Sequence, residues 1–168
     1  MSSDELVEPW LRGPVEGVDP VIGATLHAFQ QAREDLAQWT EDLSDEQIWA
    51  RPHGVAPIGF QLRHIAGSVD RLTTYLQGGQ LNALQIDALN YEMEENAGRE
   101  QLLALVEAAL KKSETALRTI DPATMAATRT VGRKRLPTTV AGLVVHLAEH
   151  TQRHVGETIV TARLLRQG

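Results

Sequence analysis

The chain has 168 residues, of which 42% are hydrophobic, 23% are charged and 4% are aromatic, and its formal net charge is −6. One domain with its own core fits this length, and a core poor in aromatic residues must be built from Leu, Val, Ile and Ala, which favours a helical bundle over a β-sandwich. The acidic balance argues against a nucleic-acid partner, and the absence of cysteine excludes disulfides, thiolate ligands and a cysteine nucleophile.

The N-terminal residues 1–18 contain two prolines and two glycines, so we expect an irregular lead-in. The segment Met1–Glu5 is acidic and lacks an apolar run, so no signal peptide is expected. No run of about 18 apolar residues occurs anywhere, so we expect no membrane partner. With no cysteine to oxidise, a reducing cytoplasm is the expected location.

Four long segments carry apolar residues at helical spacing, and they predict helices over about 20–42, 58–77, 99–119 and 137–165. The first begins with Asp19-Pro20, a cap residue followed by proline at the first helical position. After it, Ser44 and Gln47 form the pattern of a capping box for a short helical turn. The second long helix ends at Gly78-Gly79.

Two connections are more than simple turns. The segment between the second and third long helices is too long for a turn and too apolar for a free linker, so we expect a crossover that carries a short helix. Residues 128–136 alternate in polarity and contain Val131-Gly132, which predicts a hairpin or an extended loop. The fold class is therefore all-α, a four-helix bundle in which the second and third helices run parallel, with residues 1–168 forming a single domain.

Histidines are the residues most indicative of a site. His146, His150 and His154 follow one another at four-residue spacing on the last helix, so their side chains stack along one face. Relative to the apolar stripe, His154 lies about 60° from its centre, His150 about 100° and His146 about 140°. The inner pair is therefore the better pair of metal ligands, and His146 fits the rim.

A third ligand must come from another element, because two histidines do not make a tight site. His64 lies about 120° from the centre of the second helix's apolar stripe, on a flank that also carries Gln61, Ser68, Arg71 and Tyr75. That position suits a ligand at the edge of the bundle and equally suits a surface histidine. His27 faces away from the apolar stripe of its helix and is expected to be solvated, and His53 lies in a loop with no evident partner.

The segments Leu62–Ala66 and His146–Glu157, preceded by Leu43-Ser44-Asp45-Glu46 and a Pro-rich loop, resemble the DinB-like (YfiT-like) superfamily from about residue 20 onward. The resemblance implies a four-helix bundle that binds one divalent metal ion, nickel or zinc, on His64, His150 and His154, and it implies a homodimer. Where relatives often have Arg and then Gly-Gln after the last histidine, this chain has Val155, Gly156 and Glu157, so the arginine is missing.

Several functions remain open. Characterised relatives imply a transferase that uses a low-molecular-weight thiol, such as bacillithiol or mycothiol, as cosubstrate. The same metal site also suits a hydrolase of small-molecule amides or esters, or a stress-linked protein that binds metal without turnover. Glu157 lies on the angular line of His150, so Glu157 and His146 are candidate catalytic residues for proton transfer, and a surface role suits Glu157 equally well. The basic cluster Arg129–Arg135 is either an attractor for the carboxylates of a thiol or a solvated loop.

Overall fold

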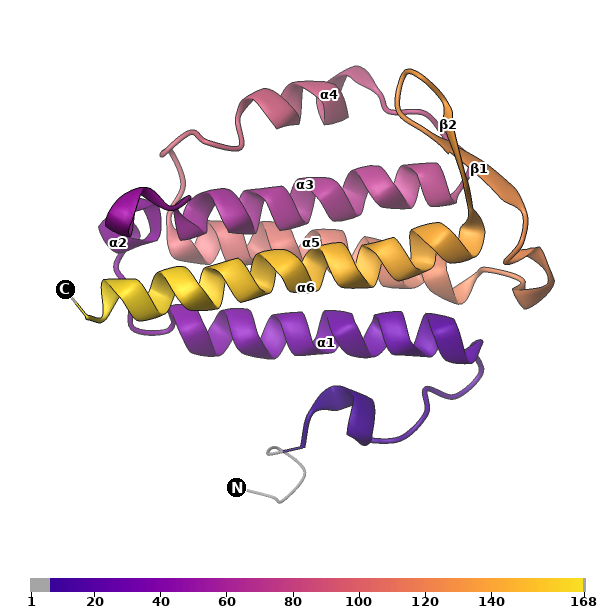
Figure 1. Cartoon of the computed structure of the whole chain (residues 1–168), viewed down its shortest axis with the longest axis horizontal. Coiled ribbons are helices and arrows are strands. Elements are labelled where there is room, and N and C mark those ends of the chain that lie inside the picture. Colours follow the sequence, from indigo (N-terminus) through magenta and orange to yellow (C-terminus); the bar gives the residue numbers. More distant parts are fainter. Residues whose placement is uncertain (1–6, 168) are drawn as a thin grey trace.

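The computed structural model describes residues 7–167 and is built around four long helices (Figure 1). They are α1 (Pro20–Thr40), α3 (Ile58–Leu76), α5 (Arg99–Arg118) and α6 (Val140–Leu165). Helix α1 packs against α6, α6 against α3 and α3 against α5, and contacts between α5 and α1 close the bundle. Figure 1 shows α3 and α5 running in one direction and α1 and α6 in the other, so the predicted four-helix bundle with parallel second and third helices is confirmed.

The crossover between α3 and α5 carries the predicted short helix, which lies over the outer side of α3 (Figure 1). This helix is capped at its start by a box in which Asn82 and Gln85 bond each other's backbone amides. The remaining elements are short: the helices α2 (Asp45–Trp49) and α4 (Ala83–Asn90), the strands β1 (Thr128–Val131) and β2 (Leu136–Thr139), and the 3-10 turns η2 (Pro9–Leu11), η3 (Pro52–Gly54) and η4 (Pro122–Thr124).

Local capping explains where the helices begin. The Asp19 side chain accepts a hydrogen bond from the Val21 amide, and Pro20 occupies the first helical position, as the sequence predicts. Ser44 and Gln47 form the predicted capping box at the start of α2. Helix α3 ends just before Gly78, whose φ of 81° is the left-handed conformation that favours glycine after a helix.

The start of the last helix differs from the prediction by three residues. Pro137 and Thr138 lie in strand β2, which pairs antiparallel with β1 in a register that sets Pro137 opposite Thr130. The helix then begins at Val140, because the Thr139 side chain accepts a hydrogen bond from the Gly142 amide. The hairpin is therefore longer than the predicted residues 128–136. Its second strand includes residues 137–139, which the sequence analysis assigned to the last helix.

The expected irregular lead-in falls partly outside the structure, because residues 1–6 lie outside the described residues, as does the segment on which the absence of a signal peptide rests. Between residue 7 and α1, the chain forms the 3-10 turn η2 and a second turn at residues 16–17. Among the helices of residues 7–167, none combines the length and the apolar character that a bilayer span requires.

The core is one cluster of mostly aliphatic side chains, in which the aromatic residues Phe29, Trp49 and Tyr75 are also buried. Helix α3 buries a second stripe beside its apolar face, and this stripe is polar: Gln61, Ser68, Arg71 and Tyr75 are all buried. This is the flank on which the sequence places His64. Since buried polar groups need partners, the flank directs attention to the interface of α3 with α6.

Candidate metal centre

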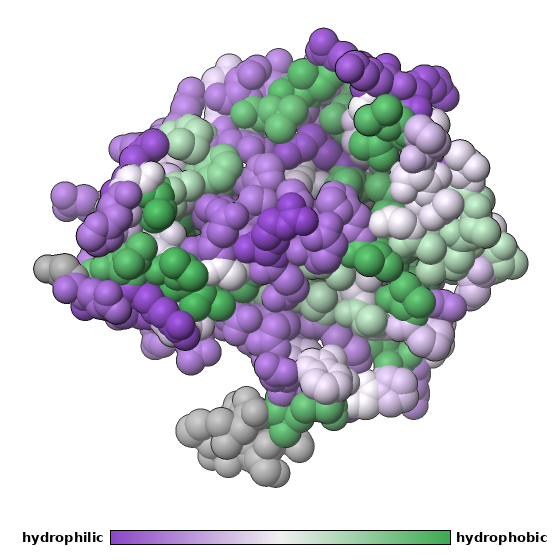
Figure 2. Space-filling model, viewed as in Figure 1, coloured by the Kyte–Doolittle hydropathy of each residue, from purple (hydrophilic) through white to green (hydrophobic). Residues whose placement is uncertain are grey.

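Three histidines converge where α3 and α6 lie side by side. His64 comes from α3, and His150 and His154 come from successive turns of α6, so the four-residue spacing brings both rings to the same side of that helix. The potential ligand atoms of the three residues all lie within 4.8 Å of one another, and within residues 7–167 they form the one such group of His, Cys, Asp or Glu. Figure 2 shows hydrophilic side chains gathered at the centre of this face of the molecule.

The spacing of the nitrogens fits a metal ion. The Nε2 atoms of His64 and His150 lie 3.1 Å apart, and the ring centroids of His64 and His154 lie 4.3 Å apart. In a tetrahedral zinc site with Zn–N bonds of 2.0–2.1 Å, two ligand nitrogens lie about 3.4 Å apart. The rings of His64 and His150 therefore need to move by only a few tenths of an ångström to share an ion.

The protonation of the rings also favours a metal. Burial, followed by the positive charges of His154 and His64, lowers the pKa of His150 to about 4. Burial likewise lowers the pKa of His154. Both imidazoles are therefore neutral at neutral pH, which is the form that binds a divalent cation.

A buried carboxylate orients His64. The Nδ1 atom of His64 donates to Oε2 of Glu92 at 2.7 Å, which leaves the lone pair of Nε2 facing the other two histidines. Arg71 donates to the second oxygen, Oε1, at 3.0 Å. Burial raises the pKa of Glu92, but the hydrogen bond from His64 and the charges of His64 and Arg71 outweigh burial and hold the pKa below its usual value. A carboxylate behind a ligand histidine is a recurrent feature of metal sites.

An amide orients His154 in the same way. The Nδ1 atom of His154 donates to Oε1 of Gln61 at 2.7 Å, and the Nε2 amide of Gln61 donates to Glu157 at 2.6 Å. Gln61 is 1% exposed, so its position is fixed by packing as well as by these bonds. The structure thus places Glu157 behind Gln61 rather than against the three-histidine cluster. The third ring, His150, has a buried Nδ1 with no hydrogen-bond partner.

His146 lies at the edge of the cluster, as its angle on the helix predicts. Its ring is 5.2 Å from that of His150, and its Nδ1 contacts Oε1 of Glu149 at 2.5 Å. The side chain is 43% exposed. With Nδ1 donating to Glu149, the lone pair of the ring lies on Nε2.

The other predicted residues lie away from the cluster. His27 is half-buried, and its Nε2 contacts the carbonyl oxygen of Gly13 at 2.9 Å, so it is not the freely solvated side chain that the helix face predicts. His53 is exposed in η3. In the basic cluster Arg129–Arg135, Arg129 bonds to the carbonyl of Leu76 at the end of α3. Leu76 is twelve residues beyond His64 in that helix, about 18 Å along its axis, so the cluster does not lie beside the histidines.

Sequence reasoning missed Glu92 as a partner of the site, and it recognised Gln61 and Arg71 only as neighbours of His64 on one helix flank. Glu92 lies in the crossover just after α4, where no periodicity assigns it a direction. One feature of the sequence indicates that a carboxylate should lie near His64. Arg71 follows His64 by seven residues, which places both on one side of α3, and a buried arginine there needs a carboxylate partner.

Comparisons with known proteins agree with this architecture. The family model of the DinB superfamily matches residues 28–158 of the chain. Among solved structures, the fold is similar to that of YfiT from Bacillus subtilis, described as a probable metal-dependent hydrolase with an unusual four-helix bundle topology. The similarity has a TM-score of 0.66 at 15% sequence identity and covers 90% of this chain and 91% of that chain, so it is a similarity of fold. No curated protein matches the sequence.

Proposed function

This chain belongs to the DinB superfamily, as the sequence motifs predict, and from that premise we propose that it is a metal-dependent hydrolase of small-molecule esters or amides. In this proposal, the Nε2 atoms of His64, His150 and His154 hold one divalent metal ion, zinc or nickel. The observation that carries it is the convergence of three histidines within 4.8 Å, two of which have their Nδ1 atoms bonded to buried acceptors.

Three histidine ligands suit a catalytic site better than a closed structural one. A divalent ion held by three protein ligands keeps an open position and acts as a Lewis acid that makes water, or an added thiol, nucleophilic near neutral pH. Within residues 7–167, no carboxylate joins the three histidines as a fourth ligand. Glu92 is engaged at Nδ1 of His64, and Glu157 accepts a hydrogen bond from Gln61, whose oxygen in turn accepts from Nδ1 of His154.

The remaining residues have separable roles. Glu92 and Gln61 are positioning residues, because they fix the tautomer and the orientation of His64 and His154. Glu157 acts one step further away, by holding the amide of Gln61 with its oxygen directed at His154. We propose that His146 accepts the proton of the attacking nucleophile at its Nε2, because its ring adjoins that of His150 while remaining accessible to solvent.

Two alternatives use the same histidines. A transferase that uses bacillithiol or mycothiol as cosubstrate draws its support from the family resemblance and from the lack of any cysteine in the chain. The structure does not support attraction of the thiol's carboxylates by the basic cluster Arg129–Arg135, because Arg129 is bound at the end of α3 that is far from the histidines. A metal-binding protein without turnover would require a closed site with a further ligand.

An activity screen separates these functions. Zinc-loaded and nickel-loaded protein is incubated with a panel of ester and amide substrates, with and without bacillithiol or mycothiol. We expect hydrolysis that needs no thiol, that disappears in His150→Ala and that persists in His27→Ala. Conjugation that requires the added thiol would replace the hydrolase with the transferase. No turnover of any substrate by fully loaded protein would favour the binding role.

We also propose that the chain works as a homodimer in a reducing cytoplasm, with a small molecule as its substrate. The family resemblance supports the dimer, and the absence of cysteine supports the compartment. Light scattering coupled to size-exclusion chromatography measures the oligomeric state directly. A mass of one chain, 18.5 kDa, at all concentrations would refute the dimer.

A further inference from the structure

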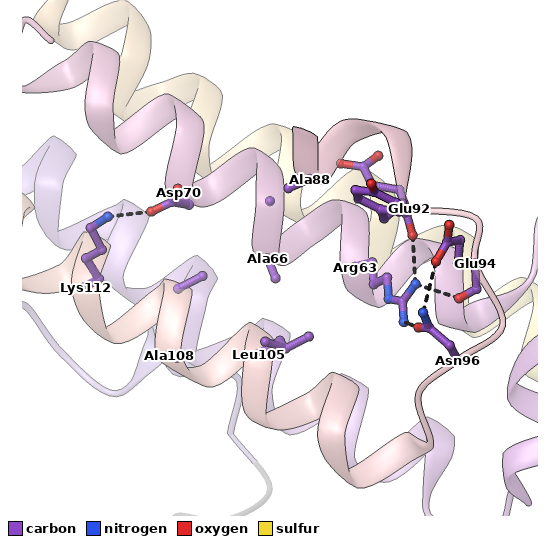
Figure 3. Close-up of a pocket in the computed structure, with 13 residues that line it drawn as sticks. Arg63, Ala66, Asp70, Ala88, Glu92, Glu94, Asn96, Leu105, Ala108 and Lys112 are labelled. Carbon is purple, nitrogen blue, oxygen red and sulfur yellow. Dashed lines mark hydrogen bonds and ion pairs between the residues drawn. The ribbon is translucent and has the colours of Figure 1, made fainter. Parts of the chain in front are cut away.

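A cavity lies on the other side of Glu92 from the histidines. It is bounded by α3, by the crossover around α4 and by α5 (Figure 3). Its volume is about 710 Å³. The lining is mostly apolar, and two of its large side chains, Leu105 and Tyr91, are 50% and 54% exposed. The smaller apolar residues in the lining are Ala66, Ala88, Ala108 and Ala109.

The charged residues that line the cavity are already paired within the protein. At one end, Lys112 forms an ion pair with Asp70 at 2.5 Å. At the other end, Arg63 donates to the carbonyl oxygens of Tyr91 and Glu94 and to the side chain of Asn96 (Figure 3). The Glu94 carboxylate accepts from Asn96, and both oxygens of Glu92 accept hydrogen bonds.

This pairing defines the chemistry of a ligand. A charged ligand would have to compete with the ion pair and the hydrogen bonds that these charged groups already make. A neutral apolar molecule instead covers Leu105, Tyr91 and the alanines and leaves the paired groups in place. The volume lies within the range of about 300–1,000 Å³ that is typical of small-molecule sites.

The cavity and the metal centre share one side chain. Glu92 lines the cavity, and its Oε2 accepts the hydrogen bond that orients His64. On α3, the cavity residues Arg63 and Gly67 flank His64 on one side, whereas Gln61 and Ser68 face α6 on the other. A molecule in the cavity therefore contacts the residue on which the position of a metal ligand depends.

We propose that this cavity binds one small, neutral, apolar molecule and that Glu92 links its occupancy to the affinity of the three-histidine centre for metal. The link rests on the metal centre proposed above, whereas the binding itself does not. By thermodynamic reciprocity, metal binding must change the affinity for the apolar molecule by the same factor.

The binding is tested with N-phenyl-1-naphthylamine, a neutral probe whose fluorescence increases in apolar surroundings, titrated into protein freed of metal by chelation. Ala108→Trp fills the cavity from an exposed position of α5, and Ala104→Trp adds the same ring to an exposed position one turn earlier that does not line the cavity. We expect saturable binding that weakens at least tenfold in the first variant and less than twofold in the second. Circular dichroism confirms that both variants are folded.

The link is tested by measuring the Kd for zinc by competition with a chromophoric chelator, with and without saturating probe. We expect at least a threefold change in wild type and in Ala104→Trp, and none in Ala108→Trp. Absence of saturable binding, or equal binding by all three proteins, would overturn the cavity assignment. Loss of a dimer in Ala108→Trp without any probe binding would assign this surface to a second copy of the chain. An unchanged zinc Kd would overturn the link, and failure to bind zinc at all would refute the metal centre while leaving the probe result intact.

Discussion

Glu92 offers the sharpest test of how the metal centre is held. The carboxylate is 7% exposed and accepts hydrogen bonds from His64 and from Arg71, which is 8% exposed. Substituting Glu92→Ala leaves the Arg71 guanidinium buried without its carboxylate, which typically costs about 3–5 kcal/mol of stability. It also frees the His64 ring, and loss of such a partner typically weakens metal binding by about 10–100-fold, which corresponds to about 1.4–2.7 kcal/mol.

The two effects are measured separately. Urea unfolding of chelated protein, followed by circular dichroism, gives the stability, and zinc competition with a chelator gives the affinity. Glu92→Gln keeps an acceptor oxygen in place and should fall between wild type and alanine in both assays. Glu94→Ala removes an exposed carboxylate of the same segment and should change stability by less than about 0.5 kcal/mol. If Glu92→Ala unfolds at the same urea concentration as Glu94→Ala and binds zinc as tightly as wild type, then the carboxylate does not support the site.

Three further predictions follow from the same geometry. Elemental analysis should find close to one divalent ion per chain in wild type and in His27→Ala, and far less in the alanine variants of His64, His150 and His154; full occupancy without His64 would contradict a site shared by α3 and α6. Removing the metal with a chelator should lower the free energy of unfolding by about 2.7 kcal/mol, relative to protein with ion at one hundred times its Kd, and should lower the Tm by about 5–10 °C. The helical signal should be retained, because the aliphatic core does not depend on the ion, and unfolding on chelation would contradict this. In chelated protein, the unfolded chain protonates His150 below about pH 6.5, whereas the native state does so only near its pKa of about 4. Stability should therefore fall from pH 6.5 to pH 4 more steeply in wild type than in His150→Gln, and parallel Tm profiles would show that His150 is not held neutral.

The sequence predicts the bundle well because local residues determine where its helices begin and end. The Asp19-Pro20 start and the Gly78 stop act within one turn of chain, so their geometry does not depend on the rest of the fold. The start of α6 was placed too early, because Pro137 suits the first turn of a helix as well as it suits a strand. What decides between them is the pairing of β2 with β1, a tertiary contact that periodicity does not contain.

The convergence of the histidines is predictable for the same reason that the helices are. A helix fixes the angle of each side chain, so His150 and His154 could be ranked above His146 before any contact was known, and the structure places the three rings in that order around the cluster. For His64, the angle on the helix is equally compatible with a surface position, because it places the residue at the edge of the apolar stripe of α3. That flank is in fact buried, since the crossover and α6 both cover it.

The hydrogen-bond partners of the three histidines are the part of the site that local sequence rules do not predict. Glu92 arrives from the crossover after α4, and its direction is set by Arg71 and His64, which lie at the other end of a long connection. One residue of α3 nevertheless carries a trace of this arrangement. Gly67 lies mid-helix, where glycine costs about 1 kcal/mol relative to alanine. A Cβ there would lie 2.7 Å from Nη1 of Arg71 and 3.2 Å from Oε1 of Glu92. The glycine therefore leaves space for the buried Arg71–Glu92 pair that orients His64, and α3 has a lower helix propensity there as a consequence of the packing behind the three-histidine cluster.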